Sequence, residues 1–243
     1  MTTRDKLQHL LHSILNPVVK LLIAAGLTPN KVTSIGLLLN IGVAAIYIAG
    51  AEYGDRNDLS YLGWGGAMIL FAGIFDMLDG QVARIGKMTS RFGALYDSVL
   101  DRYSEMIMFL GICYYLVAHH YFISSLIAFI GLIGSIMVSY TRARAEGLGI
   151  PCKDGLMQRP ERVITIGASS LTCSIIAYFT GGNQKWIIKD FDAFESITFF
   201  TIPLAIIAVL ANITAIQRIH ACYRYLQLEE NNVQPKNESS SHS

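Results

Sequence analysis

The chain has 243 residues, of which 52% are hydrophobic and 15% are charged, with a formal net charge of +1 at pH 7 and a mean hydropathy of +0.42. A soluble domain usually carries about 25% charged residues, so this composition argues against an ordinary soluble protein and favours an integral membrane protein. Several stretches without charged residues approach the roughly 20 residues that a helix needs to cross a bilayer.

The N-terminal region predicts a helix on the membrane surface rather than a secretory signal. It lacks the short apolar core and the small-residue cleavage site of a signal peptide. Within residues 5–25, apolar side chains recur at i, i+3 and i+4 spacing, which is typical of an amphipathic helix lying on the cytoplasmic face of a membrane. A helix packed beneath the bundle has the same pattern. Thr28 and Pro29 then suit the N-cap and first turn of the next helix.

The remaining apolar stretches predict six transmembrane helices, so the expected fold is an all-α integral membrane protein with a leading interfacial helix. A turn is expected at His119-His120, because the uncharged segment that contains it is long enough for most of two spans. The predicted spans are residues 32–51, 59–75, two within 106–141, 163–184 and 196–217.

The distribution of Lys and Arg predicts the orientation of these helices. If the N-terminus is cytoplasmic, only Arg56, Lys185 and Lys189 fall outside the cytoplasmic side, so both termini should be cytoplasmic. The polar residues after the last span are expected to be disordered. Three regions are therefore expected: an amphipathic helix and opening turn (1–30), a six-helix membrane domain (31–225) and a cytoplasmic tail (226–243).

Four aspartates near the predicted second and third spans form the most informative motif. Asp76 and Asp79 are spaced i, i+3, and Asp97 and Asp101 are spaced i, i+4, so each pair can lie on one helix face. Carboxylates beside hydrocarbon must be paired or bound to metal. Oxygen ligands without a neighbouring His or Cys pair indicate Mg²⁺, Mn²⁺ or Ca²⁺ rather than zinc, and Mg²⁺ commonly shares phosphate ligands with a substrate. The motif therefore predicts a divalent-metal site for phosphate chemistry at the cytoplasmic face.

Small and basic residues beside these aspartates indicate space for a ligand. Gly80 and Ala83 would let a ligand approach the helix closely, and Arg84 could hold an acid or a phosphate. The small residues alone would also suit close packing between helices.

The spacing of this motif resembles the signature of the CDP-alcohol phosphotransferase family. Asp76-x-x-Asp79-Gly80-x-x-Ala83-Arg84, eight further residues, and Gly93-x-x-x-Asp97-x-x-x-Asp101 match that signature at every defined position. The turn Thr28-Pro29-Asn30-x-x-Thr33 also resembles the opening turn of the family, and the resemblance covers about residues 5 to 225. Members join a CDP-activated lipid or alcohol to a second alcohol and release CMP, use two divalent metal ions and are commonly homodimers.

The resemblance implies a function for each part of the motif. CDP-diacylglycerol would be the donor, with its acyl chains in the bilayer of a prokaryotic-type cytoplasmic membrane and its CDP head at the cytoplasmic face. Two Mg²⁺ or Mn²⁺ ions would bind to the four aspartates, and Asp101 would also be the general base. A homodimer and no nucleic-acid partner are expected. The implied contacts to the CDP moiety are Thr28, Asn30, Asp76, Asp79, Gly80, Ala83 and Arg84.

A second group of residues concerns the acceptor. Arg-Ala-Arg-Ala-Glu-Gly at 142–147 and Arg-Pro-Glu-Arg at 159–162 resemble the prokaryotic phosphatidylinositol phosphate synthase subgroup of the family. Guanidinium groups bind phosphate bidentately, although positive-inside anchoring alone would also place arginines here. The residues implied to bind the phosphate of inositol 1-phosphate are Arg142, Arg144, Arg159 and Arg162.

Two alternatives stay open. Glycerol 3-phosphate would suit the same basic pocket, which would make the protein a phosphatidylglycerophosphate synthase. A divalent-cation transporter is an alternative from another class, but transporters place their acids near the bilayer midplane. Acids near one membrane face with arginines opposite favour an anionic substrate.

Overall fold

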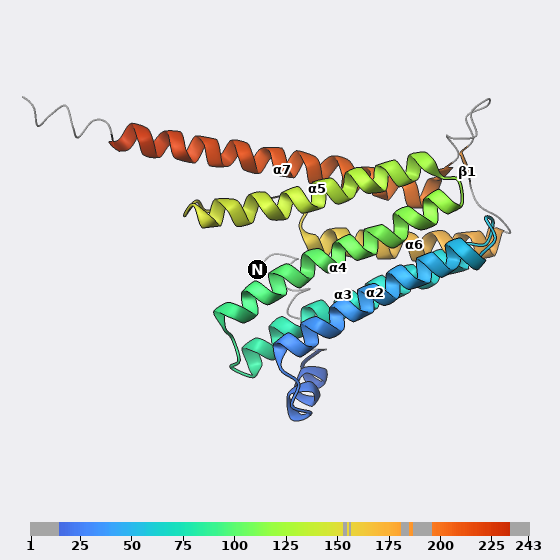
Figure 1. Cartoon of the computed structure of the whole chain (residues 1–243), viewed down its shortest axis with the longest axis horizontal. Coiled ribbons are helices and arrows are strands. Elements are labelled where there is room, and N and C mark those ends of the chain that lie inside the picture. The colour runs from blue at the N-terminus through green and yellow to red at the C-terminus, as the bar shows by residue number, and fades with distance from the viewer. Residues whose placement is uncertain (1–14, 153–154, 156, 181–184, 187–195, 234–243) are drawn as a thin grey trace, which may run out of the picture.

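Six long helices lie side by side in the computed structural model, which describes residues 15–152, 155, 157–180, 185–186 and 196–233 (Figure 1). A shorter helical segment, Leu15–Ala24, precedes them. The only strands in the described ranges are the two-residue β1 (Lys185–Trp186) and β2 (Ser196–Ile197), which pair antiparallel at one end of the bundle and were not predicted. The long helices are α2 (Pro29–Tyr53), α3 (Ser60–Ile85), α4 (Arg91–Ala118), α5 (Phe122–Gly147), α6 (Arg159–Thr180) and α7 (Thr198–Val233).

Five of these helices, all but α4, contain segments long and apolar enough to cross a membrane, which makes the chain an integral membrane protein. α4 carries Asp97, Asp101 and Glu105, and these acids lower its mean hydropathy. The predicted turn at His119-His120 is confirmed, because α4 ends at Ala118 with His119 as its C-cap residue and α5 begins at Phe122.

Two predicted boundaries differ from the structure. α3 continues ten residues beyond the predicted end of its span at 75, so Asp76 and Asp79 lie on the helix itself. α7 continues to Val233, so residues 226–233 are helical and the prediction of a disordered tail is wrong for them. Leu226, Gln227, Glu229 and Glu230 favour helix, and a helix leaving the bundle can continue in water. The rest of that tail, 234–243, lies outside the described residues, as do 181–184 of the fifth predicted span.

The leading helix packs against the bundle. Val19 of Leu15–Ala24 is buried with Val32 of α2 and with Leu78 and Val82 of α3. Leu21 on the same segment remains 69% exposed. Contact with the bundle is therefore a finding, whereas its position on the membrane surface stays a prediction; residues 1–14 are outside the described range.

Close contact between α3 and α6 determines where the first turn of α6 lies. A Cβ atom added to Gly66 of α3 would lie 2.6 Å from the backbone nitrogen of Leu171 and 2.7 Å from the carbonyl oxygen of Gly167. Beside this contact, Ser170 Oγ lies 2.7 Å from Tyr47 Oη and donates to Leu62 O at 2.7 Å. These contacts join α2, α3 and α6 around the apolar core, and they bring the N-terminal end of α6 beside the acidic end of α3.

Candidate active site

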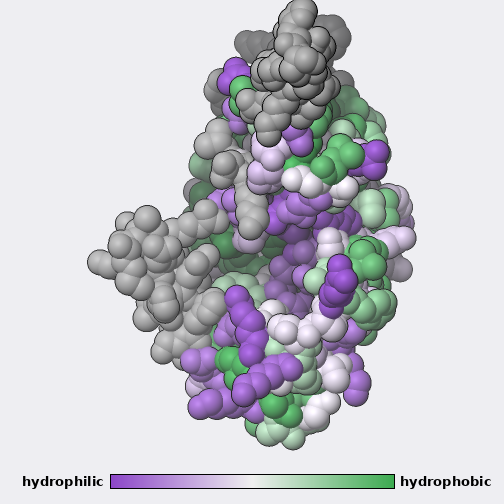
Figure 2. Space-filling model, turned by 90° about the vertical axis from the view of Figure 1, so that its left-hand side faces the viewer, coloured by the Kyte–Doolittle hydropathy of each residue, from purple (hydrophilic) through white to green (hydrophobic). Residues whose placement is uncertain are grey.

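The motif residues gather at one end of the bundle, opposite β1 and β2. Five of the long helices begin or end there with motif residues, and hydrophilic side chains line a hollow at this end (Figure 2). Cavities at this end are lined by the four aspartates on α3 and α4, and one of them also by basic residues of α5, α6 and α7.

The four aspartates lie together between α3 and α4. Asp76, Asp79 and Asp101 line one small cavity, and Asp79 and Asp97 line a second one. Ser90 caps the start of α4 by accepting a hydrogen bond from Gly93 N at 2.9 Å. The i, i+3 and i, i+4 spacings therefore place all four carboxylates along one seam between the two helices.

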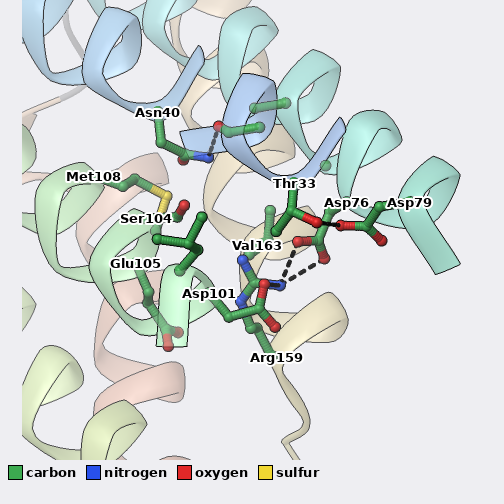
Figure 3. A pocket seen from close by; sticks show the side chains of 14 residues that line it. Thr33, Asn40, Asp76, Asp79, Asp101, Ser104, Glu105, Met108, Arg159 and Val163 are labelled. Carbon is green, nitrogen blue, oxygen red and sulfur yellow. Dashed lines mark hydrogen bonds and ion pairs between the residues drawn. The ribbon is translucent and has the colours of Figure 1, made fainter. Parts of the chain in front are cut away.

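Asp79 accepts hydrogen bonds from two neutral donors. Thr33 Oγ1 on α2 donates to Asp79 Oδ2 at 2.9 Å (Figure 3). The backbone N–H of Gly80 donates to Asp79 Oδ1 at 2.5 Å. The Asp79 residue is 5% exposed. Two donors to a buried carboxylate stabilise its charged form and fix its orientation.

Arg159 of α6 lies between Asp76 and Asp101. Its Nη1 is 2.6 Å from both carboxylate oxygens of Asp76 and 2.9 Å from Asp101 Oδ1 (Figure 3). Two carboxylates about 5 Å apart repel by roughly 3 kcal/mol at an effective dielectric of about 20. A cation between them offsets that repulsion, and Arg159 supplies one here.

The donor set fits a hard divalent cation. All four acids offer carboxylate oxygen, the ligand that Mg²⁺ and Mn²⁺ prefer, and their paired arrangement calls for positive charge. Within the described ranges, however, no group of three or more His, Cys, Asp or Glu side chains has the geometry of a formed metal site. The four aspartates as metal ligands therefore stay a prediction.

Two cavities of about 330 Å³ each meet at this seam. The first, which we call the α2–α4 cavity, lies between the opening turn of α2, the end of α3 and the start of α4. The second, the arginine cavity, lies between α4, α5, α6 and α7. Asp97 borders both, whereas Asp101 borders only the arginine cavity of the two. Asp76 and Asp101 also border a smaller inner cavity, whose lining Figure 3 shows.

Most residues expected to contact the CDP moiety line the α2–α4 cavity. Thr28 is not among them: it is the N-cap residue of α2, without a side-chain capping bond, and its carbonyl accepts from Lys31 N and Val32 N. Asp76 lines the inner cavity instead. Thr33 borders the α2–α4 cavity and was missed as a site residue, although it is part of the opening-turn motif. The expected residues that line this cavity are Asn30, Asp79, Gly80, Ala83 and Arg84.

The arginine cavity contains three of the four arginines expected to bind the acceptor. Arg142, Arg159 and Arg162 line it, but Arg144 does not, since a residue two positions along a helix points to a different face. Arg142 pairs with Glu146 at 2.9 Å, and both border the cavity. Arg162 is buried in an ion pair with Glu105. Phosphate binding by any of these residues stays a prediction.

Two further arginines of this cavity were missed by the sequence analysis. Arg102 follows Asp101 on α4, and Arg218 lies on α7 with Nη1 2.5 Å from the carbonyl oxygen of Val138 on α5. Arg218 is only 4% exposed. The sequence marks Arg218 only by its position directly after the last apolar stretch. Positive-inside anchoring predicts a basic residue at the same position, so this signal does not identify a site residue.

Aspartates and arginines facing each other at the polar end of a helical membrane bundle are the features of a membrane-embedded transferase acting on phosphate esters. The chain belongs to the CDP-alcohol phosphatidyltransferase family, whose sequence profile matches residues 26–222.

Several relatives of known name resemble most of the chain. It is 32% identical over 211 residues to the phosphatidylinositol phosphate synthase of Mycobacteroides abscessus, covering 86% of this chain and 83% of the relative. It is 33% identical over 193 residues to the archaetidylinositol phosphate synthase of Methanothermobacter thermautotrophicus, covering 79% and 82%.

Crystal structures of the phosphatidylinositol phosphate synthase of Mycobacterium tuberculosis have the same fold. The complex with CDP-DAG superposes with a TM-score of 0.65 at 28% identity, covering 87% of this chain and 94% of the other. The complex with manganese and citrate gives a TM-score of 0.66 at 27% identity, covering 85% and 88%.

Proposed function

We propose that this protein transfers the phosphatidyl group of CDP-diacylglycerol to a hydroxyl of inositol 1-phosphate, giving phosphatidylinositol phosphate and CMP. One observation carries the proposal: two cavities meet at a row of aspartates, one bordered by the family motif and the other by arginines. The named relatives, which are inositol phosphate lipid synthases from bacteria and an archaeon, support this acceptor.

The α2–α4 cavity is the proposed site of the CDP moiety. Gly80 and Ala83 leave its wall open beside Asp79, and the carbonyl oxygen of Gly80 accepts a hydrogen bond from Arg84 Nε at 3.0 Å. Asn30 contributes an amide from the opening turn of α2. The acyl chains of the donor would lie in the bilayer beside the apolar surfaces of the helices.

The metal ions of the reaction would bind to Asp76, Asp79, Asp97 and Asp101. When bound, a divalent cation neutralises negative charge on the diphosphate as the bond to CMP breaks. We propose two ions, Mg²⁺ or Mn²⁺; the manganese complex of the related M. tuberculosis enzyme supports a divalent metal.

Asp101 is the proposed general base. It borders the arginine cavity but not the α2–α4 cavity, so its carboxylate faces the side from which an acceptor would approach. Asp101 would take the proton of the acceptor hydroxyl as that oxygen attacks the phosphorus nearest the diacylglycerol. The bond from this phosphorus to the oxygen of CMP breaks, and CMP leaves with the electron pair.

The arginine cavity is the proposed acceptor site. Arg142, Arg159 and Arg218 bring positive charge from three helices to a single concave site beside Asp101. A phosphorylated alcohol bound there would place its phosphate on guanidinium groups and its hydroxyl toward the aspartates. Arg144, outside this cavity, would act in membrane anchoring instead.

The arrangement in the membrane completes the proposal. All six long helices cross the bilayer, α4 included, with both termini and the site at the cytoplasmic face and Leu15–Ala24 in the interface. The α4 acids are tolerated because Asp97 and Asp101 border the arginine cavity and Glu105 pairs with Arg162. We also propose a homodimer, which size-exclusion chromatography with light scattering in detergent would test.

Acceptor-dependent CMP release tests this function. Purified protein with CDP-diacylglycerol and Mg²⁺ is expected to release CMP fastest with inositol 1-phosphate, compared with glycerol 3-phosphate, inositol and serine. Preference for glycerol 3-phosphate would contradict the acceptor but not the reaction class. Equal inactivity with all four, together with Mg²⁺ flux into liposomes, would favour a cation transporter.

A further inference from the structure

We infer that Glu105 and Arg162 position the first turn of α6, and with it Arg159, against the aspartate site. Neither residue is assigned a catalytic step above, and both lie one helical turn deeper in the bundle than the pair that borders the site. The inference rests on the proposed function only where it links Arg159 to acceptor binding.

The two side chains form a bidentate ion pair with almost no exposure to solvent. Arg162 Nε donates to Glu105 Oε1 at 2.9 Å, and Arg162 Nη2 donates to Glu105 Oε2 at 3.1 Å. The side chains are 0% and 2% exposed. This geometry restrains both the distance and the rotation of α6 relative to α4.

The same guanidinium also holds the chain that leads into α6. Arg162 Nη1 donates to the carbonyl oxygen of Met157 at 2.8 Å, two residues before the helix begins. Gln158 N donates to Glu161 Oε2 at 2.9 Å, which caps the same turn. Each of the three nitrogens of Arg162 is therefore engaged within the protein. Although Arg162 borders the arginine cavity, we assign it a positioning role instead of contact with the acceptor phosphate.

The ion pair is one of two parallel links between α4 and α6. Asp101 and Glu105 are one turn apart on α4, and Arg159 and Arg162 are one turn apart on α6. The first link, Arg159 to Asp101, lies in the site, and Glu105 projects from the same helix to one side of this contact (Figure 3). Since Arg159 is the first residue of α6, a shift of that turn changes where its guanidinium lies relative to Asp101 and Asp76.

A purely stabilising role would not require charge at these positions. A buried ion pair offsets its desolvation cost only partly, and apolar residues of similar volume often stabilise a protein at least as well. The extra hydrogen bond to Met157 O is what an apolar pair could not supply. A positioning role predicts that the first turn of α6 changes its orientation when the ion pair is replaced, whereas a purely stabilising role does not.

The test compares the apolar double variant Glu105→Leu/Arg162→Met with Glu105→Asp, which keeps the charge but shortens the side chain. For each purified variant, thermal unfolding, kcat, the KM values for inositol 1-phosphate and CDP-diacylglycerol, and hydrogen–deuterium exchange of residues 157–162 are measured. Glu52→Gln is the matched control, because Glu52 accepts a hydrogen bond from Tyr114 at the opposite end of the bundle.

The double variant is expected to unfold no earlier than the wild type. Exchange at 157–162 should be faster and the KM for inositol 1-phosphate higher, by up to about 100-fold, with the KM for CDP-diacylglycerol unchanged. Glu105→Asp should show the same changes to a smaller extent: faster exchange, a higher KM for inositol 1-phosphate and an unchanged KM for CDP-diacylglycerol. If the double variant does not fold, Glu105→Asp alone tests the positioning role. Wild-type acceptor KM and wild-type exchange in the folded variants would overturn the inference. Wild-type protein inactive with inositol 1-phosphate would contradict the proposed function instead, and the exchange data would still decide the positioning role.

Discussion

Each of the four aspartates has a different set of neighbours, and these neighbours separate their expected roles. Asp79 is fixed by Thr33 Oγ1 and Gly80 N, whereas Asp76 and Asp101 share the guanidinium of Arg159. Asp97 lies on the boundary between the two large cavities. A firmly oriented carboxylate suits a ligand, and a carboxylate facing the acceptor cavity suits a base.

Replacement of Asp101, the proposed base, tests whether the aspartates have these different roles. Asp101→Asn should lower kcat by at least about 100-fold, because the amide cannot accept the hydroxyl proton, while CDP-diacylglycerol still binds. The measurement is CMP release together with donor binding. Asp55→Asn, in the turn after α2, is the control for loss of one carboxylate. An Asp101→Asn protein with normal turnover would remove Asp101 from the role of base.

The hydrogen bond from Thr33 predicts a specific effect on metal binding. Thr33→Val keeps the shape of the side chain but loses the donor to Asp79, so Mn²⁺ affinity should fall by about 10- to 100-fold. Titration followed by electron paramagnetic resonance measures this without turnover. Thr33→Ser retains the hydroxyl and should bind Mn²⁺ nearly as the wild type does; equal affinity in all three proteins would show that this bond does not orient the ligand.

At the scale of the elements, α6 connects the packing of the bundle to the geometry of the site. It packs against α3 so closely at Gly66 that an added methyl group would meet backbone atoms of Leu171 and Gly167. The same helix begins with Arg159, which contacts α3 through Asp76 and α4 through Asp101. The spacing of α3 and α6 therefore determines whether a basic residue from a distant part of the chain reaches the acids.

Gly66→Ala should reduce stability by about 1–3 kcal/mol, because the backbone of α6 must move to accept the methyl group. Thermal unfolding in detergent would measure the loss. Gly147→Ala is the matched control: the added Cβ would meet no atom within 4 Å, and alanine favours helix. Similar unfolding temperatures for wild type and Gly66→Ala would mean that α3 and α6 can separate at little cost.

Across the whole molecule, polar chemistry lies at one end and the helices between the ends are apolar. The chain reaches that end repeatedly, at the start of α2, α4 and α6 and at the end of α3, α5 and α7. Such an arrangement brings Asp97 and Asp101 together with Arg142, Arg159, Arg162 and Arg218 at one cavity. A water-soluble acceptor and a membrane-bound donor could meet there.

The proposed orientation can be tested by labelling in intact cells. In a background with Cys113, Cys152, Cys173 and Cys222 replaced, a membrane-impermeant maleimide should label Asn57→Cys from outside. It should label Leu148→Cys only after permeabilisation, because positive residues keep the α5–α6 connection cytoplasmic. The opposite pattern would reverse the orientation of the whole bundle and place the site outside.

The sequence by itself determined the membrane class, the turn at His119-His120 and the family, because hydropathy and the spacing of a short motif are local properties of the chain. The same local reasoning found Asn30, Gly80, Ala83 and Arg84 for the α2–α4 cavity. Thr28 and Arg144 have suitable residue types, but their side chains do not line the α2–α4 cavity or the arginine cavity.

Only the tertiary structure decided which of the arginines face the aspartates and which form contacts elsewhere in the protein. Three contacts join residues that are 57 to 83 positions apart along the chain. They are Arg162 with Glu105, Arg159 with Asp76, and Arg218 with the carbonyl oxygen of Val138. Positive charge at a cytoplasmic helix end has the same appearance in sequence whether it anchors the helix, pairs with a buried acid or lines a cavity. Packing of α6 on α3 and of α7 on α5 separates these cases, because it determines the distance from each guanidinium to its partner.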